Sequence, residues 1–257
     1  MDYTANYNST KYYQMEPIIQ MYETPEDLAQ AFALQLISWI KETDGDTFHV
    51  ALSGGRTPSL LFSFLAAKSA GALPWQKIHF WWGDERMVVP TDPESNFGVA
   101  NQLLFSKVPV SSAQIHRIRG ESDPSLEVQR YAIEIKSNVP AINEVPAFDL
   151  ILLGMGDDGH TASIFPNQMA LLKSQEITGT AQHPVTGQQR ITLTGKMINN
   201  AKKVAFLCTG VSKSKIFNEI IHNTPQAKAY PAAHIRPVGE LFWFVDEACG
   251  KWNQELN

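Results

Sequence analysis

The chain has 257 residues, of which 44% are hydrophobic and 18% are charged, so it can bury a sizeable core and is not a disordered chain. Its formal net charge of −5 and the lack of a dense basic patch argue against binding to nucleic acid. No apolar run approaches the roughly 20 residues of a membrane span, and the N-terminus has neither the basic start nor the apolar stretch of a signal peptide, so we expect a cytoplasmic protein without a membrane partner.

Helix signals begin at residue 24 and recur along the chain. Thr24 followed by Pro25 is typical of a helix start, with the threonine as N-cap and the proline at the first helical position. Apolar residues then recur four positions apart, which predicts one buried face of an amphipathic helix. These residues are Leu28, Phe32, Leu36 and Ile40. Further helices are expected to begin near Thr57, Ser95, Asp123 and Ser212, with Ser212 acting as a cap.

Short apolar runs between the helices predict strands. The strongest is 148–153, in which leucine and isoleucine follow a single acid. The others are 48–52, 78–82, 204–208 and 241–245, with weaker candidates at 115–118 and 191–193. Near-continuous apolar strands that alternate with helices are typical of a mostly parallel sheet with helices on both faces. We therefore predict an α/β fold with one catalytic domain over residues 16–257 and a flexible tail over residues 1–15.

The two cysteines, Cys208 and Cys249, are far apart in the sequence. They match no metal-binding or redox spacing, so we expect two reduced thiols.

The loop after strand 48–52 has the composition of a phosphate cradle. Paired glycines let the backbone approach a ligand closely, and the helix start behind them directs free N–H groups and a positive dipole end toward it. The expected phosphate ligands are Ser53, Gly54, Gly55, Arg56 and Thr57. A plain glycine turn into a helix is the structural alternative. The loop 209–213 repeats the arrangement with Lys213 supplying charge, although a simple capped helix would explain it as well.

Three consecutive charged residues, Asp84, Glu85 and Arg86, follow the aromatic strand 78–82. Charges directly after a buried strand are costly unless the site there is polar and functional. A solvated loop end is the alternative. We expect Asp84 and Arg86 to belong to the catalytic site.

The loop 154–161 follows the strongest strand and carries His160. Asp158, two residues earlier, can orient the imidazole or share a substrate with it. A lone histidine is usually structural, but one flanked by glycines and acids at a strand end favours a functional role.

The same loop matches the dinucleotide-binding pattern G-x-G-x-x-G, and we reject that interpretation. Asp157 and Asp158 would oppose a pyrophosphate, and no convincing strand leads to the acid that the pattern requires further on. A metal site formed by these two acids and His160 is disfavoured, because no second histidine stands at ligand spacing. We therefore expect neither a nucleotide nor a metal.

Together these stretches resemble 6-phosphogluconolactonases, within a wider family that includes the glucosamine-6-phosphate isomerases. The matching segments, in order, are ALSGGRTP, WWGDER with the following SNF, FDLILLGMGDDGHTASIFP, RITLT and TGVSK. The likeness runs from about residue 24 to the C-terminus. The resemblance implies a Rossmann-like sheet and hydrolysis of 6-phospho-D-glucono-1,5-lactone to 6-phosphogluconate in the pentose phosphate pathway, without metal or nucleotide.

The chemistry implied by the resemblance is ester hydrolysis with a histidine base. His160, neutral near pH 7, would take the proton of the attacking water. Asp158 would hold the imidazole or the substrate hydroxyls, and Arg86 would meet either the oxyanion or the phosphate. Arg190, in RITLT, and Lys213 join residues 53–57 as phosphate anchors, which would fix the ring in one orientation.

Two positions bear on the branch of the family. The amino-sugar isomerases carry a glutamate five residues after the histidine, where this chain has Phe165. His234, in PAAHIRP, stands where arginine is common in lactonases, which leaves a substrate contact there open.

Two alternative functions remain open. One is an amino-sugar phosphate isomerase or deaminase, which Phe165 disfavours. The other is a non-catalytic sugar-phosphate sensor, which would need a DNA-binding module, and the segment before residue 24 is too short for one. The expected partner is a small sugar-phosphate lactone, bound by a monomer or a homodimer.

Overall fold

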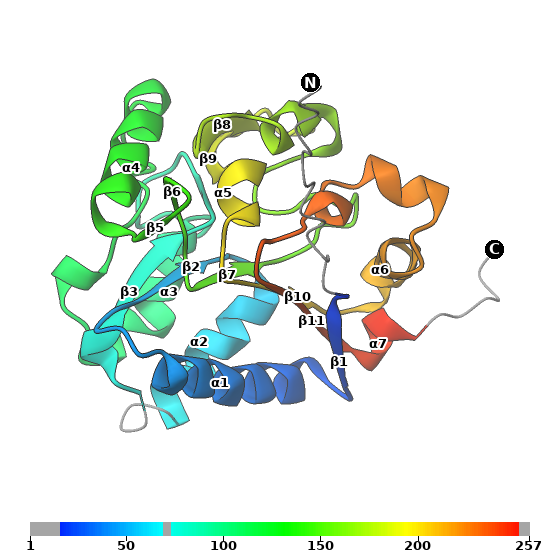
Figure 1. The fold of residues 1–257 in the computed structure, drawn as a ribbon, viewed down its shortest axis with the longest axis horizontal. Helices are drawn as coiled ribbons and strands as arrows, with labels where there is room; N and C mark the ends of the chain where they lie inside the picture. The colour runs from blue at the N-terminus through cyan, green and yellow to red at the C-terminus, as the bar shows by residue number, and fades with distance from the viewer. Residues whose placement is uncertain (1–15, 69–72, 252–257) are drawn as a thin grey trace, which may run out of the picture.

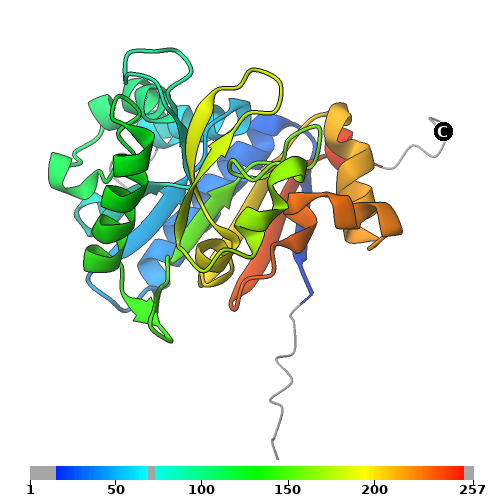
Figure 2. The same cartoon turned by 90° about the horizontal axis from the view of Figure 1, so that it is seen from above.

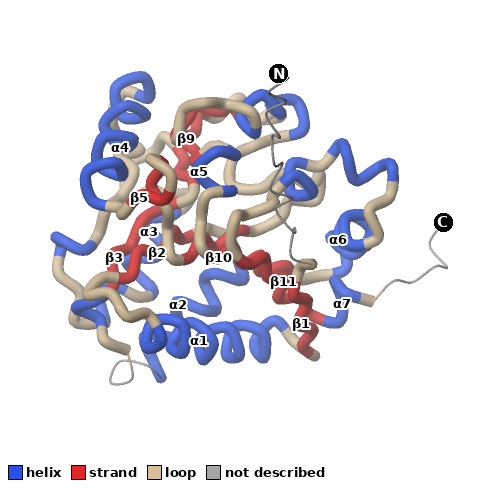
Figure 3. Tube along the Cα trace, viewed as in Figure 1, coloured by secondary structure: helices blue, strands red, loops and turns tan. Residues whose placement is uncertain are grey.

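Six parallel strands form the central sheet of the computed structural model, which describes residues 16–68 and 73–251. Across the sheet the strands are β1 (Ile18–Tyr22), β11 (Glu240–Asp246), β10 (Lys203–Cys208), β7 (Leu150–Leu153), β2 (Phe48–Leu52) and β3 (Ile78–Trp82). Each neighbouring pair is parallel. In Figure 3 the sheet crosses the molecule from β3 to β1. The predicted tail, residues 1–15, lies outside the described residues.

Helices and a smaller sheet cover the two faces of the central sheet (Figure 1). On one side lie α1 (Pro25–Glu42) and α2 (Arg56–Lys68), with α3 (Asn96–Leu103) packed on α2. On the other lie α4 (Pro124–Asn138), α5 (Gly195–Asn199) and the antiparallel strands β4 (Asp84–Arg86), β9 (Gln189–Leu193) and β8 (Thr178–Gln182). Figure 2 shows the β8–β9 hairpin between green α4 and the orange segment that contains α6 (Ser214–Ile221). The predicted single-domain α/β fold with both faces covered is confirmed.

Shorter elements complete the described chain. The chain ends its regular structure with α7 (Glu247–Gly250), and β5 (Ala141–Ile142) pairs with β6 (Val145–Pro146). The 3-10 helices are η1 (Trp75–Lys77), η2 (Phe105–Lys107), η3 (Ser112–Gln114), η4 (Pro166–Leu172), η5 (Val211–Lys213), η6 (Pro225–Ala229) and η7 (Pro231–His234). Within the described ranges, no helix combines the length and apolar character needed to span a bilayer.

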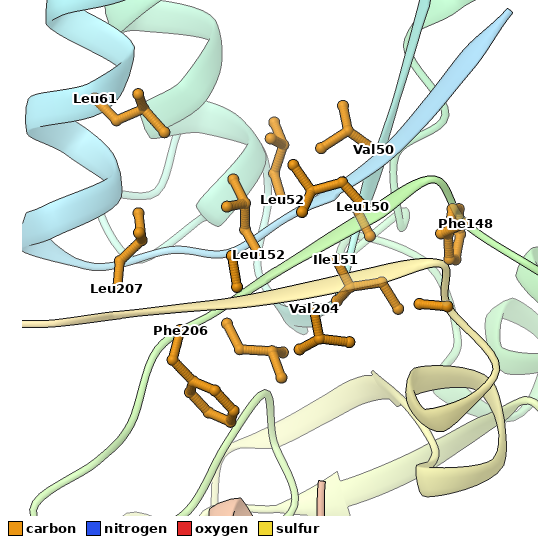
Figure 4. Close-up of a cluster of buried hydrophobic side chains, with 14 of the residues drawn as sticks. Val50, Leu52, Leu61, Phe148, Leu150, Ile151, Leu152, Val204, Phe206 and Leu207 are labelled. Atoms are coloured by element: carbon orange, nitrogen blue, oxygen red, sulfur yellow. The ribbon is translucent and has the colours of Figure 1, made fainter. Parts of the chain in front are cut away.

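The core forms where the central strands alternate their side chains between the two faces of the sheet. Leu152 and Leu207 point toward Leu61 of α2, whereas Phe206 points to the opposite face (Figure 4). There Phe206 stacks on Trp243, with ring centroids 4.0 Å apart. These side chains are all at most 3% exposed, and full burial of such a side chain contributes about 1.5–3 kcal/mol each.

The helix caps were predicted with mixed success. Thr24 accepts a hydrogen bond from Asp27 N, and Asp123 accepts from the backbone of Ser125, so both predicted N-caps are confirmed. The predicted cap at Ser212 is wrong. Helix α6 begins at Ser214, and the Ser212 hydroxyl donates instead to Asp157.

Several strand assignments from the sequence need correction. Residues 84–86, expected to form a loop, are strand β4, and β9 pairs with it and with β8 in a separate sheet instead of joining the central one. Strands β1 and β8 were not predicted, because each is short, no residue of β1 is buried and only two residues of β8 are. Residues 115–118 are no strand, since their pairing with β3 is limited to one bridge, Phe80 to Ile115.

The two cysteines meet although they are distant in sequence. Cys208 ends β10 and Cys249 lies in α7, and their sulfur atoms are 3.3 Å apart in the reduced form. Both side chains are fully buried.

The order of the strands fixes where a ligand can bind. The chain runs outward from β2 to β3, returns to β7 on the other side of β2, and then continues outward to β10 and β11. Loops that leave the carboxyl ends of β2 and β7 therefore diverge, and a crevice opens between them. This is the place where the sequence predicted the phosphate cradle and the His160 loop.

Far from that crevice, His49 makes the stability of the fold depend on pH. It is buried at the start of β2 and its Nδ1 accepts a hydrogen bond from Trp81. Burial first, and then the neighbouring His79, lowers the pKa of His49 from 6.5 to about 4. Between these values the unfolded chain binds the proton and the folded chain does not, so stability falls as the pH falls.

We expect His49 to lower the free energy of unfolding, measured with urea, by on the order of 1 kcal/mol between pH 7 and pH 5, after allowance for solvent screening. The raised pKa of the buried Glu85 acts in the opposite direction, so the contribution of His49 is the difference between the pH dependence of the wild type and that of His49→Gln, which retains an acceptor for Trp81. The exposed His234→Gln should leave the wild-type pH dependence unchanged. An equal pH dependence in His49→Gln and the wild type would contradict this assignment.

Candidate active site

Segments that leave the carboxyl ends of four parallel strands line one cavity of about 880 Å³. They follow β2, β3, β7 and β10, the four strands that the sequence predicted, and the segment after β3 contributes through strand β4. Their residues in the cavity wall are Gly54, Gly55, Arg56, Thr57, Arg86, Gly154, Met155, Asp157, Thr209, Gly210, Ser212 and Lys213. His160 and Asp158 belong to one of these segments, but they are not among the described residues that line the cavity.

A short hydrogen bond joins Asp158 to His160. Asp158 Oδ1 lies 2.6 Å from His160 Nδ1 and also accepts from the His160 backbone N at 3.0 Å. Burial of Asp158 opposes ionisation, but the hydrogen bonds from His160 outweigh it and lower the pKa of Asp158 to about 2. The ionised carboxylate therefore holds the proton of His160 on Nδ1, which leaves the lone pair of Nε2 available to accept a proton.

Two glycines make this geometry possible. A Cβ at Gly156 would lie 2.1 Å from His160 Nδ1, so the imidazole can pack only against a glycine. Gly159 has a φ of +79° and touches the Tyr230 ring, where a Cβ would approach to 2.6 Å. Ala232 N also donates to Gly159 O at 3.0 Å. The segment 230–235 therefore supports the His160 loop, while His234 itself is bonded to Lys228 O.

Arg86 and Arg190 are directly opposite each other on β4 and β9. Like charges in such a cross-strand pair repel each other. Both guanidinium groups also have a buried Nε without a hydrogen-bond partner among the described residues. Burial first, and then Arg86, lowers the pKa of Arg190. Two opposed cations with unused donors favour binding of an anion.

The two acids before Arg86, Asp84 and Glu85, form hydrogen bonds with other groups of the protein. Asp84 is 5% exposed and its Oδ2 accepts from Ser163 Oγ at 2.6 Å, with Arg190 Nη1 4.0 Å away. Glu85 accepts from the backbone N–H groups of Asn96 and Phe97, and its burial raises the pKa of its carboxyl to about 7. Asp84 was predicted to be catalytic, but these contacts favour a role in holding β4, β9 and the His160 loop together.

The glycine loop after β2 is shaped by close contacts. A Cβ on Gly54 would lie 1.9 Å from Asn96 Oδ1, and Gly55 has a φ of +105°. Thr57 Oγ1 lies 2.9 Å from Thr209 Oγ1, which joins this loop to the one after β10. Ser53 is buried beside them, whereas the exposed Arg56 begins α2 and lines the cavity.

Lys213 lines the cavity but already has an acid partner. Its Nζ donates to Asp157 Oδ1 at 2.9 Å, and Ser212 Oγ donates to the same oxygen at 3.0 Å. The hydrogen bond from Lys213 lowers the pKa of Asp157. Part of the charge predicted to meet a phosphate is therefore compensated within the protein.

A ring contact that the sequence did not predict joins Phe165 to both His160 and His183. The buried Phe165 ring has its centroid 4.8 Å from that of His160 and 5.3 Å from that of His183. The Arg190 guanidinium carbon lies 5.9 Å from the same ring. His183 follows the unpredicted strand β8, and the only signal for it was its position seven residues before Arg190.

Taken together, the doubly covered parallel sheet, the cavity at its carboxyl edge and the carboxylate–imidazole pair define a Rossmann-like α/β enzyme. A family model described as glucosamine-6-phosphate isomerases/6-phosphogluconolactonase matches residues 23–243. The chain belongs to this family. In the part of the chain that the structure describes, no three His, Cys, Asp or Glu side chains are grouped so that they could hold a metal ion.

Several relatives are named as 6-phosphogluconolactonases. The chain is 46% identical over 202 residues to the 6-phosphogluconolactonase of Haemophilus influenzae, which covers 78% of this chain and 85% of that one. The structure of the present chain superposes on that of the devB protein with a TM-score of 0.85 and 40% identity, over 90% of this chain and 97% of the other. The 6-phosphogluconolactonase of Trypanosoma brucei gives a TM-score of 0.81 with 27% identity, over 94% and 99%.

Proposed function

We propose that the protein hydrolyses 6-phospho-D-glucono-1,5-lactone to 6-phospho-D-gluconate, in the oxidative branch of the pentose phosphate pathway, with His160 as general base. The names of its relatives support the substrate. The observation that carries the mechanism is the 2.6 Å hydrogen bond between Asp158 and His160, because it leaves Nε2 free to accept a proton. We further propose that the enzyme works in the cytoplasm as a monomer or homodimer.

In this mechanism His160 Nε2 takes a proton from water as the water oxygen attacks the lactone carbonyl carbon. The tetrahedral intermediate collapses, the bond from that carbon to the ring oxygen breaks, and the proton on Nε2 passes to the ring oxygen. The product acid then loses a proton to solvent. Asp158 stabilises the transient imidazolium and keeps the ring in one tautomer.

The opposed arginines are the proposed phosphate site. From the sequence, Arg86 could contact either the oxyanion or the phosphate. Its position directly opposite Arg190 favours contact with the phosphate. A phosphate monoester, which carries about −1.5 to −2 charge at pH 7, offsets the repulsion between two guanidinium groups and accepts hydrogen bonds from their unused Nε donors. Arg86 and the glycine loop share a cavity, so residues 53–57 add backbone N–H groups to the same phosphate.

The isomerase alternative is disfavoured by Phe165. Its ring is 1% exposed and packs against His160, and it has no group that could transfer a proton. The non-catalytic sensor is disfavoured by the Asp158–His160 pair, because simple sugar binding does not require an imidazole whose Nε2 is kept ready to accept a proton.

We expect rapid acid release from 6-phosphogluconolactone, above the rate of its spontaneous hydrolysis, and undetectable ammonia release from glucosamine 6-phosphate. A pH indicator measures the first and a coupled ammonia assay the second. Ammonia release at a rate comparable with lactone hydrolysis would favour the isomerase branch. Binding of both sugar phosphates without turnover of either would favour the sensor.

A further inference from the structure

The β8–β9 hairpin presents a row of polar side chains on one face. Arg190 lies opposite Arg86 on one side and Ala181 on the other. The register continues beyond the strands, because His183 N donates to Gln188 O at 2.9 Å. Residues opposite each other or two apart on a strand share a face, so His183 and Gln188 lie on the face of the arginine pair. The hydrogen bond from Arg190 Nη2 to Gln188 Oε1 at 3.0 Å agrees with this.

The turn after β8 fixes the tautomer of His183. Its Nδ1 accepts hydrogen bonds from Val185 N at 3.3 Å and Thr186 N at 3.2 Å. A neutral imidazole whose Nδ1 accepts carries its proton on Nε2. The turn uses only Nδ1 of His183, so the Nε2–H group is a donor that takes no part in the turn.

The cations Arg190 and Arg86 act on His183, which lies next to the His160 loop through its contact with Phe165. The Phe165 ring contacts both imidazoles, and Arg190 contacts the same ring. Burial first, and then Arg190 and His160, lowers the pKa of His183, while Asp158 opposes this and Arg86 adds to it. An anion bound by Arg86 and Arg190 would reverse the balance and favour the imidazolium.

We propose that His183 is a third ligand of the substrate phosphate, donating from Nε2 beside Arg86 and Arg190, and thereby a determinant of specificity for phosphorylated lactones. This inference rests on the proposed lactonase function. It assigns each of the three terminal phosphate oxygens a donor from a different position on one sheet face. The proposal also assigns the β8–β9 hairpin a role in substrate binding, in addition to its role in the fold.

Two substitutions separate binding from support of the turn. In His183→Asn, Oδ1 replaces Nδ1 as the acceptor for the turn, but the Nε2 donor is lost. In His183→Gln, the amide retains a donor near the position of Nε2, but the acceptor for the turn is displaced. A binding role predicts that asparagine is the more harmful change, whereas a purely structural role predicts that glutamine is.

The expected result for His183→Asn is a rise of about 10- to 100-fold in KM for 6-phosphogluconolactone, with kcat changed much less. His183→Gln should retain most of the affinity. Neither variant should change hydrolysis of unphosphorylated glucono-δ-lactone, and His234→Gln, a histidine replaced on a neighbouring segment, should match the wild type. An unchanged KM in His183→Asn, or a larger loss in His183→Gln, would overturn the inference.

Sulfate provides a second readout, because this dianion does not titrate between pH 5 and 8. Competitive inhibition by sulfate should strengthen toward acid pH in the wild type as His183 gains its proton, and His183→Asn should lose that part of the pH dependence. An identical pH dependence in both proteins would contradict the proposal. A wild type that hydrolyses no lactone at all would instead contradict the proposed function.

Discussion

Replacement of His160 by asparagine is expected to lower kcat for 6-phosphogluconolactone by about 10²- to 10⁴-fold, which is the usual contribution of a general base. The asparagine side chain can still face Asp158, so the loop should retain its shape, but it cannot take a proton from water. KM should change little, since the proposed phosphate ligands are untouched. Initial rates of acid release, corrected for spontaneous hydrolysis, provide the measurement.

The matched control for this substitution is His234→Asn. His234 is also a histidine near the His160 loop, but its Nε2 is bonded to Lys228 O at 2.8 Å. It should therefore tolerate the same change with nearly full activity. If His160→Asn turned over lactone at close to the wild-type rate, another group would have to be the base.

Replacement of Arg190 by methionine is expected to raise KM for the phosphorylated lactone by about 10- to 150-fold, equivalent to about 1.5–3 kcal/mol for a lost charge-assisted contact. Methionine retains an apolar stem against Phe165 and removes the guanidinium group. Lys213→Met should have a smaller effect, because Asp157 already compensates the Lys213 charge. Steady-state kinetics on the purified variants decide between these outcomes.

Unphosphorylated glucono-δ-lactone is the control substrate for Arg190→Met. It lacks the phosphate, so the variant and the wild type should hydrolyse it equally well. Arg117→Met is the control variant, since Arg117 forms an ion pair with Glu121 elsewhere on the surface. Equal losses on both lactones would mean that Arg190 supports the fold or the chemistry and not phosphate binding.

The sequence predicted best what depends on neighbouring residues. The Asp158–His160 pair is separated by two positions, so its geometry follows from one glycine-rich turn and was expected from the pattern alone. The caps at Thr24 and Asp123 are equally local. Apolar runs likewise identified the inner strands of the central sheet, since these strands are buried on both faces.

What the sequence did not predict depends on pairing between distant segments. Arg86 and Arg190 were each singled out, but nothing local indicates that they are directly opposite each other. The same applies to Lys213 and Asp157, and to the two cysteines. Strand β8 was missed because TGTAQ is a weak strand pattern that is stabilised by β9 and α4, and His183 was missed with it.

The pairing of β4 with β9 also bears on how the protein reaches its active form. Bringing together strands so far apart in the chain loses much chain entropy before any contact compensates for it, and such long-range closures slow folding. A growing chain that has just passed His160 holds the base but neither Arg190 nor His183. In the proposed site, tight binding of the phosphorylated lactone is acquired only when the hairpin closes onto β4. The return of activity on a low concentration of that lactone during refolding therefore reports this long-range closure, which a measurement of helix content would not detect.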